Sequence, residues 1–311
     1  MKILITGSLG FIATNLIIKL SQKNKYSLVG VDSGISQSCN KIFTSKLCNH
    51  NLIDLNNKNK LCILLKDVDL VIHLAANGNV IESIENPLLN FQSNVICTLN
   101  LLECMREMNV KKLIFSSTGG ALIGNCNPPV NELSFPKPIS PYGASKLACE
   151  GYISSYAESF GIKSTILRFS NVYGTYSLHK KGVINKWIDC ALNNTSITIY
   201  GDGQSSRDYI HVKDLCDGIN LAIEYLEKKN IEKNNIFHLA NNQETTLKDL
   251  FNLLSKISSK QLKVNYLPSR KGEVIRNFAD IKKAKFILGF EPIISLEEGL
   301  KNLYEWIADY K

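Results

Sequence analysis

The sequence predicts an α/β protein built on a doubly wound parallel sheet, and three observations carry this prediction. Short apolar runs rich in β-branched residues recur at 2–6, 27–32, 68–76 and 112–118, as buried parallel strands do. Segments with apolar residues at helical spacing separate these runs, which is the alternation of strands with crossover helices. The first run ends in a glycine-rich loop, and ligands of such sheets bind at the carboxyl ends of the strands.

The composition is that of an ordinary globular protein. The chain has 311 residues, 44% of them hydrophobic and 21% charged, enough for a sizeable core. No apolar run approaches the length of a membrane span, and the N-terminal residues lack the pattern of a signal peptide. We therefore expect a cytoplasmic protein that does not associate with membranes.

The nine cysteines and five histidines are dispersed along the chain. No two cysteines have C-x-x-C spacing, their number is odd, and most lie within apolar runs. This pattern predicts buried free thiols in a reducing compartment. The dispersed histidines predict no metal cluster.

The net charge of +8 raises the question of nucleic-acid binding. The lysines are scattered in pairs, however, and make no continuous basic stripe. An anionic small-molecule substrate therefore suits the charge better than a nucleic acid.

The loop after the first run has the form G-x-x-G-x-x-A, with Gly7, Gly10 and Ala13. Its glycines let the backbone turn tightly beside a phosphate, and the following helix N-terminus offers amide donors to the negative charge. Ala13 stands where glycine is usual, and its methyl group is compatible with packing of the helix on the strand. The loop predicts a dinucleotide-binding site.

Asp32 ends the second run, 25 residues after Gly7. A carboxylate there accepts hydrogen bonds from both ribose hydroxyls of an adenosine and repels a 2′-phosphate, which favours NAD over NADP. The alternative is an ordinary strand-to-helix turn with a solvated aspartate.

Tyr142 and Lys146 stand four residues apart at the start of a predicted helix, so they share one face about 6 Å apart along the axis. A nearby ammonium favours the phenolate and lowers the pKa of the phenol. The pair is thus a candidate for proton transfer to or from an alcohol or ketone. The alternative is a packed ring beside a solvated amine. Thr118 ends a predicted strand and would lie at the same sheet edge.

The second half contains further elements and a change in pattern. We expect a helix from about 90 to 108, a strand at 164–169, a strand at 236–240 that returns to the main sheet, a helix capped by Thr246 and a last helix from about Ser295. Beyond Gly174 the units become shorter and more polar. We predict one domain from 1–172, rejoined by about 206–242, and a smaller interleaved α/β substrate-binding domain from 173–205 and 243–311.

Several motifs together resemble the extended short-chain dehydrogenase/reductases, whose sheet is of the Rossmann type. These are T-G-S-L-G-F-I-A at 6–13, the acid at 32, H-L-A-A at 73–76, S-S-T at 116–118 and Y-G-A-S-K at 142–146. R-x-x-N-V-Y-G at 168–174, G-D-G-x-x-x-R-D-Y-I-H-V-x-D at 201–214 and R-x-G-E at 270–273 extend the likeness. The chain is most similar to the nucleotide-sugar epimerase and dehydratase branch, typified by the UDP-glucose 4-epimerases.

The resemblance implies a role for each matching residue. Tyr142 is the catalytic base, Lys146 holds the nicotinamide ribose and lowers the tyrosine pKa, and Thr118 hydrogen-bonds the sugar oxygen. Contacts to NAD fall to Gly7, Gly10, Phe11, Ile12, Asp32, Asp54, Leu55, Leu74, Ala75, Ala76, Asn94, Ser116, Tyr142 and Lys146. Contacts to a nucleotide-sugar substrate, expected to be UDP-linked, fall to Thr118, Asn171, Tyr200, Arg207, Arg270 and Glu273.

Arg207 is the first candidate for the diphosphate, because the planar guanidinium forms bidentate, charge-assisted hydrogen bonds. The alternative is a surface ion pair with Asp208 or Asp214. His211, in the same motif, is expected to be structural.

The predicted reaction is NAD-dependent C4 epimerisation of a UDP-hexose or UDP-N-acetylhexosamine through a transient 4-keto sugar. In the related 4,6-dehydratases an Asp-Glu pair follows the threonine, whereas here Gly119 and Gly120 follow it, which disfavours dehydration. Ile123 stands where the family usually has tyrosine. Asn277 aligns with the position that limits sugar size, and its intermediate volume admits an N-acetylated sugar.

Two alternatives differ in what they would do with the same site. A 4-ketosugar reductase would consume NAD(P)H, and a cofactor-sensing binding protein would show no turnover, although such proteins tend to lose the Tyr/Lys pair. The resemblance also implies a homodimer formed through helices at 90–110 and 145–160, and a role in carbohydrate metabolism such as polysaccharide biosynthesis.

Overall fold

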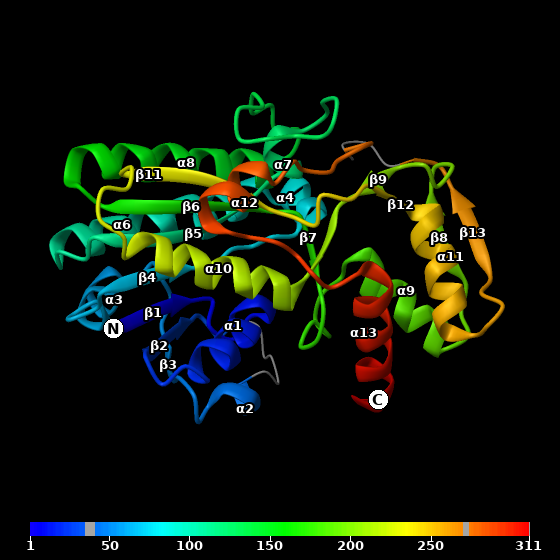
Figure 1. Cartoon of the computed structure of the whole chain (residues 1–311), viewed down its shortest axis with the longest axis horizontal. Helices are drawn as coiled ribbons and strands as arrows, with labels where there is room; N and C mark the ends of the chain where they lie inside the picture. Colours follow the sequence, from blue (N-terminus) through cyan, green and yellow to red (C-terminus); the bar gives the residue numbers. More distant parts are fainter. Residues whose placement is uncertain (35–40, 270–273, 311) are drawn as a thin grey trace.

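The computed structural model describes residues 1–34, 41–269 and 274–310, and its centre is a parallel sheet of seven strands (Figure 1). The strand order is β11-β6-β5-β4-β1-β2-β3, and each neighbouring pair is parallel. The order reverses between β1 and β4, which creates the crevice where ligands of such sheets bind. The strands are β1 (Lys2–Thr6), β2 (Ser27–Asp32), β3 (Asn49–Leu52), β4 (Leu70–His73), β5 (Lys112–Thr118), β6 (Lys163–Phe169) and β11 (Asn234–Leu239).

Helices cover both faces of this sheet, so the predicted doubly wound α/β fold is confirmed. One core cluster joins the sheet to α1 (Phe11–Ser21), α10 (Val212–Leu226) and α12 (Lys282–Leu288). A second cluster joins the opposite face to α3 (Lys58–Leu64), α6 (Cys97–Glu107) and α8 (Pro141–Phe160). Figure 1 shows the sheet between these two layers. Burial of apolar side chains on both faces is the reason the strands read as continuous hydrophobic runs.

A smaller group of elements lies beside the sheet, at the right of Figure 1. It contains α9 (Val183–Leu192), β8 (Ile197–Tyr200), α11 (Leu247–Ser258), β13 (Val264–Leu267) and α13 (Leu296–Tyr310). Trp187, Leu250 and Leu303 are buried in its own core cluster. Three two-stranded pairs complete it: β8 with β13, β7 (Asn171–Tyr173) with β10 (Tyr209–His211), and β9 (Ser206–Arg207) with β12 (Thr245–Thr246).

The return of the chain to the main sheet follows the predicted pattern. β11 pairs with β6 at the sheet edge, and α12 then packs against the same core through residues such as Ala284. The predicted cap of α11 is also present: Thr246 and Asp249 form a reciprocal capping box, which satisfies two amides of the first turn.

The long helix predicted over 90–108 is present but is not uniform. It comprises α5 (Pro87–Phe91), a π-helical turn η1 (Gln92–Ile96) and α6; shorter helices are α2 (Lys41–Thr44), α4 (Val80–Glu85) and α7 (Gly120–Ile123). At the π turn the Thr98 hydroxyl donates to the carbonyl of Asn94 at 2.6 Å. A hydroxyl that bonds this carbonyl competes with the regular helical ladder, and such π turns are frequent at functional sites.

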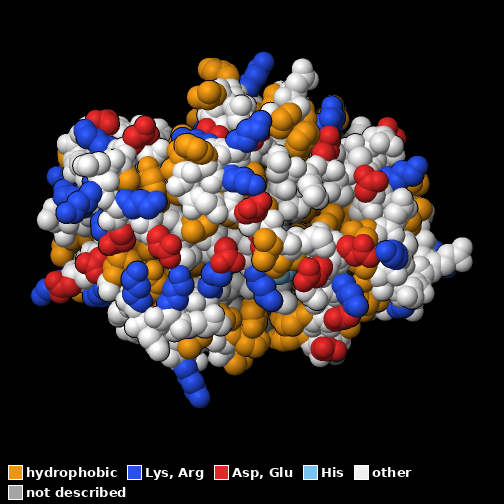
Figure 2. All heavy atoms as spheres, in the orientation of Figure 1, with side chains coloured by type: hydrophobic (Ala, Val, Ile, Leu, Met, Phe, Trp, Pro, Cys, Tyr) orange, Lys and Arg blue, Asp and Glu red, His pale blue; other side chains and the backbone are white. Residues whose placement is uncertain are grey.

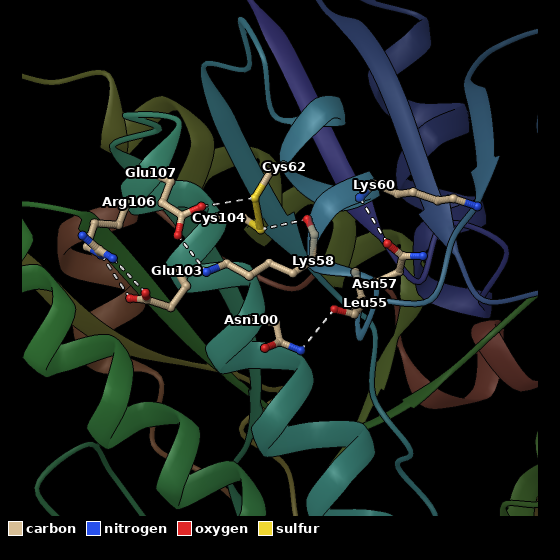
Figure 3. The surroundings of a disulfide bond; sticks show 10 residues. All are labelled: Leu55, Asn57, Lys58, Lys60, Cys62, Asn100, Glu103, Cys104, Arg106 and Glu107. Carbon is tan, nitrogen blue, oxygen red and sulfur yellow. Dashed lines mark hydrogen bonds and ion pairs between the residues drawn. A yellow bond between two sulfur atoms is a disulfide. The ribbon is translucent and has the colours of Figure 1, made fainter.

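One expectation about the cysteines is wrong. Cys62 of α3 and Cys104 of α6 form a disulfide between two helices that pack side by side (Figure 3). Lys58 and Glu107 form an ion pair of 2.7 Å across the same two helices. The sequence separation of 42 between the cysteines hides the pairing from any reading of local spacing. The other described cysteines are free thiols: Cys48, Cys97, Cys126, Cys149, Cys190 and Cys216.

Lysine and arginine side chains are intermixed with acidic ones on the face shown in Figure 2. Within the described ranges, no helix combines the length and apolar character that crossing a bilayer requires. No cluster of potential metal ligands occurs among the same residues.

Candidate active site

The loop between β1 and α1 is shaped by two glycines. Gly7 adopts a positive φ of 66°, and a Cβ placed on it would lie 2.8 Å from the backbone of Ala75. The Gly10 amide donates to the Gly7 carbonyl at 2.9 Å, and Gly10 caps α1 without a side-chain bond. Ala75 is held in place because its amide donates to Thr6 Oγ1 at 3.2 Å. The loop and the segment after β4 thus form a close-walled cradle at the N-terminus of a helix.

Asp32 lies at the edge of this cradle. Its Oδ2 accepts from the Leu9 amide at 3.1 Å and its Oδ1 from the Gly34 amide at 2.9 Å. The carboxylate is 9% exposed and keeps further lone pairs for two hydroxyl groups. The cradle, the uncapped helix end and this carboxylate fit the diphosphate and adenosine ribose of a dinucleotide.

The other residues expected at the cofactor are distributed around the same edge. Asp54 is exposed and lies next to Ile53, whose amide donates to the Asp32 carbonyl at 2.8 Å. Leu55 is buried, and its carbonyl accepts from Asn100 Nδ2 at 3.3 Å. Three residues follow β4 directly (Leu74, Ala75, Ala76), and two open α1 (Phe11, whose ring is in the core, and Ile12, half-buried).

Asn94 is hydrogen-bonded within the protein beside the cradle, and its contact with NAD stays a prediction. Its Oδ1 accepts from the Asn77 amide at 2.8 Å, and its Nδ2 donates to the Asn77 carbonyl at 3.1 Å and to Ser145 Oγ at 3.0 Å. These bonds occupy the amide hydrogens of a side chain that is 2% exposed. Asn94 therefore links the segment after β4 to α8. The same segment comes near the catalytic tyrosine, because a Cβ on Gly78, next to Asn77, would lie 4.0 Å from the Tyr142 hydroxyl.

The predicted Tyr/Lys pair meets the end of β5. Ser140 caps α8 by accepting from the Gly143 amide, and Pro141 occupies its first turn, so Tyr142 starts the helix at the sheet edge. The Tyr142 hydroxyl is hydrogen-bonded to Thr118. Lys146 Nζ donates to the Ser116 carbonyl at 2.7 Å. The structure therefore brings three expected catalytic side chains and Ser116 into one cluster.

Burial dominates the electrostatics of the pair. It raises the pKa of Tyr142 to about 12, and the Thr118 hydrogen bond opposes part of that rise. It also lowers the pKa of Lys146 to about 8. In the protein alone, desolvation of the phenolate sets the direction of the shift; the lowering of the Tyr142 pKa by Lys146 stays a prediction.

His73 links three elements beneath the cradle. Its Nδ1 lies 2.6 Å from Thr6 Oγ1 and its Nε2 3.0 Å from Thr98 Oγ1. Burial and the nearby Lys146 lower the pKa of His73 to about 3, so the ring is neutral and structural.

Asn171 and Arg207, both expected to contact the substrate, lie on chain segments joined by a backbone hydrogen bond. The Asn171 amide donates to the Asp208 carbonyl at 2.9 Å, next to Arg207, whose Nη1 donates to the Ser206 carbonyl at 2.7 Å. Tyr200 ends β8 in register with Leu267. Arg270 and Glu273 lie outside the described residues.

The surface-pair alternative for Arg207 receives no support from the described part of the chain. The Asp208 carboxylate is buried and accepts from the Asn241 and Ala279 amides, and burial raises its pKa to about 6. The Asp214 carboxylate accepts from the Ile294 amide at 3.0 Å. His211, 3% exposed, caps α10 by accepting from the Lys213 amide, as a structural histidine does.

The glycines after Thr118 are closely surrounded. A Cβ on Gly119 would lie 3.0 Å from the His238 ring, and one on Gly120 would lie 3.0 Å from Asn277 Oδ1. Asn277 is 6% exposed, and its Nδ2 has no partner among the described residues. Ile123 is buried in the core. The side chains of His238 and Asn277 thus lie close to Gly119 and Gly120, the positions at which a dehydratase carries its acid pair.

Sequence reasoning missed several residues that hold this site. Ser83 Oγ accepts from the Tyr142 amide at 3.2 Å. Glu150, Ser117 and Arg168 form a buried network behind Lys146. Glu150 could have been found from the sequence, because it stands four residues after Lys146 and so shares its helix face. The contacts of Ser83 and Arg168 depend on packing, and no sequence signal indicates them.

The fold and the site together define a dinucleotide-dependent enzyme that acts on alcohols or ketones. The model of the NAD dependent epimerase/dehydratase family matches residues 3–240, and the chain belongs to this family.

Individual relatives match over the full chain. The chain is 38% identical over 311 residues, 99% of its length and 98% of the relative's, to a putative UDP-glucose 4-epimerase of Methanocaldococcus jannaschii. It is similar to the Thermotoga maritima UDP-glucose 4-epimerase crystallised with UDP-glucose, with a TM-score of 0.93, 35% identity and coverage of 100% and 99% of the two chains. It is equally similar to the Bacillus cereus UDP-glucuronic acid 4-epimerase in complex with UDP-glucuronic acid and NAD, with a TM-score of 0.93, 32% identity and full coverage of both chains.

Proposed function

We propose that this protein is an NAD-dependent nucleotide-sugar epimerase that inverts C4 of a UDP-hexose or UDP-N-acetylhexosamine through a transient 4-keto sugar. The observation that carries the proposal is the cluster of Tyr142, Lys146 and Thr118 beside two glycines, which supply no acid side chain. A site with a proton-transfer group and no dehydrating acid supports oxidation and reduction at one carbon rather than elimination. The full-length similarity to 4-epimerases supports the same reaction.

The protein's own residues move and hold the proton. Tyr142 takes the proton of the sugar 4-hydroxyl and later returns it, while Thr118 holds the sugar oxygen at the hydroxyl of Tyr142. The Lys146 ammonium favours the phenolate. The 4-keto sugar turns between the two half-reactions, so that C4 is reduced on its other face, and Tyr142 returns the proton to the C4 oxygen.

NAD fits the cradle formed by Gly7, Gly10 and Asp32. When bound it accepts and returns the hydride and adds a positive charge beside the phenol. Asp54, Leu55 and the residues after β4 are proposed to line the remainder of its site, and Asn94 supports that site from behind.

Arginine and asparagine are proposed to bind the nucleotide part of the substrate. Arg207 and Asn171 lie on neighbouring chain segments, and their side chains suit diphosphate oxygens. Tyr200, Arg270 and Glu273 remain proposed contacts on the basis of their motifs. Binding energy from this remote part of the substrate orients the sugar for reaction.

Asn277 is proposed to set the size of the sugar site. Its buried, unpaired Nδ2 is free to donate to a substrate oxygen, and its side chain is smaller than an aromatic ring. An N-acetyl group is therefore accommodated.

We further propose the homodimer expected through the helices at 90–110 and 145–160, and add α5, which precedes the first of them and packs on α8. These helices pack together and expose Leu88 (68%), Leu89 (52%) and Tyr152 (44%), an apolar surface of the kind that marks an interface. Light scattering should give twice the mass of the chain, and Leu88→Glu with Leu89→Glu should give the monomer.

The domain division proposed above remains 1–172 with about 206–242, and 173–205 with 243–311. The separate core cluster around Trp187 supports it, except that α12, which lies within 243–311, packs into the core of the main sheet. Limited proteolysis that releases no fragment between these bounds would count against it.

We propose the cytoplasm as the location, because six described cysteines remain free thiols and such thiols persist in reducing compartments. A place in polysaccharide biosynthesis is proposed from the substrate class. Cell fractionation and the glycan composition of a deletion strain test these two statements.

Product analysis tests the reaction itself. Purified protein is incubated with UDP-glucose, UDP-galactose, their N-acetyl forms and UDP-glucuronic acid, and the products are separated. Interconversion of at least one pair without net use of NADH is expected. A 4-ketosugar reductase, which the relatives do not favour, would leave all five unchanged and consume NADH with a ketosugar; that result would sink the epimerase proposal.

A further inference from the structure

Glu150 lies on the same face of α8 as the catalytic pair. Tyr142, Lys146 and Glu150 follow one another at intervals of four residues, which stacks them along one side of the helix. Lys146 and Glu150 are only 2% and 5% exposed. The face of α8 that carries the chemistry thus continues into a buried carboxylate.

This carboxylate is fully engaged by two strands. Its Oε1 accepts from Ser117 Oγ at 2.6 Å and from Arg168 Nε at 3.1 Å, and its Oε2 accepts from Arg168 Nη2 at 2.8 Å. Ser117 and Arg168 are register partners on β5 and β6. Ser117 also lies between Ser116 and Thr118, so three consecutive residues of β5 each hold one residue of the same face of α8.

A buried ion pair is weak evidence for a stabilising role. Desolvation of two charges offsets most of their attraction, and apolar side chains of similar volume often stabilise a core equally well or better. The Arg168–Glu150 pair, with side chains 3% and 6% exposed, therefore calls for another explanation.

We propose that Glu150, held by Arg168 and Ser117, is a positioning residue that fixes Lys146 and Tyr142 against the end of β5 and keeps the Lys146 side chain charged. The proposal rests on the epimerase function proposed above. A bidentate fork defines both the distance and the angle between its partners, so it restrains α8 from sliding or rotating on the sheet. Small displacements of a catalytic group reduce the rate strongly.

The electrostatic part follows from the surroundings of Lys146. The titratable and charged groups that face it in the described structure are Tyr142, Cys149 and Glu150 on α8, His73 on β4, and Arg168 beyond Glu150 on β6. Burial lowers the pKa of Lys146, and Cys149 and then the Glu150 carboxylate act against that lowering. Loss of Glu150 should therefore let the ammonium lose its proton at a lower pH.

The test replaces the pair by apolar residues, Glu150→Met with Arg168→Met, so that no buried charge is left alone. The matched control is Glu158→Met with Lys233→Met, because Glu158 is also on α8 and pairs with Lys233 at 2.7 Å but is exposed. We expect the first variant to melt close to the wild type, with kcat at least about tenfold lower and KM changed by less than about twofold. The control should match the wild type in all three.

Two readouts separate positioning from simple support of the fold. The alkaline limb of the kcat profile should move to lower pH, as should the Lys146 titration followed by NMR of isotopically labelled lysine in the protein alone. Wild-type kcat and an unmoved lysine titration in the folded pair variant would overturn the proposal. If that variant does not fold, Ser117→Ala decides: we expect about threefold lower kcat with a modest loss of stability, and wild-type kcat would overturn the proposal.

The lysine titration needs neither substrate nor NAD. If the wild-type protein epimerises none of the sugars, the proposed function is refuted. The lysine titration would still decide whether Glu150 keeps Lys146 charged.

Discussion

Two glycines with the same positive φ offer a direct test of the cofactor cradle. Gly7 and Gly161 both have a φ of 66°, but a Cβ on Gly161 meets nothing within 4 Å, whereas one on Gly7 lies 2.8 Å from Cα and N of Ala75. An alanine in this left-handed conformation costs roughly 1–2 kcal/mol at either position. Overpacking against backbone adds about 1–3 kcal/mol. Gly161→Ala should thus lose about 1–2 kcal/mol of unfolding free energy and Gly7→Ala about 2–5 kcal/mol.

The two variants should also differ in cofactor binding. Relief of the overlap requires Ala75 to move, which strains the bond from its amide to Thr6 Oγ1 and opens the cradle. Urea unfolding gives the stability difference, and calorimetric titration with NAD gives the affinity. We expect Gly7→Ala to bind NAD at least about tenfold more weakly, which corresponds to 1.4 kcal/mol, and Gly161→Ala to bind it normally. Equal stability losses, or normal NAD binding by Gly7→Ala, would refute the cradle.

Three further outcomes are expected. Tyr142→Phe should lower kcat by at least about a thousandfold, because the proton-transfer group is lost, while NAD remains bound; undiminished turnover would remove the base assignment. Cys62→Ser should lower the unfolding free energy by about 2–4 kcal/mol, since the disulfide closes a long loop, and the free thiol replaced in Cys190→Ser should have little effect; an equal result for both would count against the bond. Unfolding free energy should fall by about 2–4 kcal/mol from pH 7 to pH 5, because burial holds the pKa of His73 and of His238 at about 3.

The sign of the pH effect follows from proton uptake. A histidine whose pKa is lower in the folded than in the unfolded chain contributes its full stability above pH about 6.5, and loses it as the pH falls towards the folded value. Asp208 acts in the opposite sense, because burial raises its pKa to about 6 and protonation below that pH favours the folded state. A stability that rose steadily from pH 7 to pH 5 would contradict the neutral, buried state of the two histidines.

The elements that were predicted well have local causes. β1 and its glycine loop, the cap at Thr246 and the Tyr142/Lys146 spacing each depend on residues within a few positions of one another. Strand burial, helix capping and same-face stacking are decided over such distances. The strand at 236–240 was recognised from the same pattern, and the sheet accepted it at its edge.

The features that sequence reasoning missed depend on contacts between distant segments. The Cys62–Cys104 disulfide requires α3 to pack on α6. The hydrogen bonds that join the Asn94 side chain, at the π turn, to the backbone of Asn77 were not predicted either. No local pattern encodes either contact.

The sequence by itself determined the kind of chemistry, because the side chains that bind a dinucleotide and transfer a proton stand in short motifs. Only the tertiary structure decided how that chemistry is tuned. Burial raises the tyrosine pKa and lowers the lysine pKa, and the buried pair of Glu150 with Arg168 joins α8 to β6. Desolvation and buried hydrogen bonds depend on which elements pack together, and packing is a property of the whole fold.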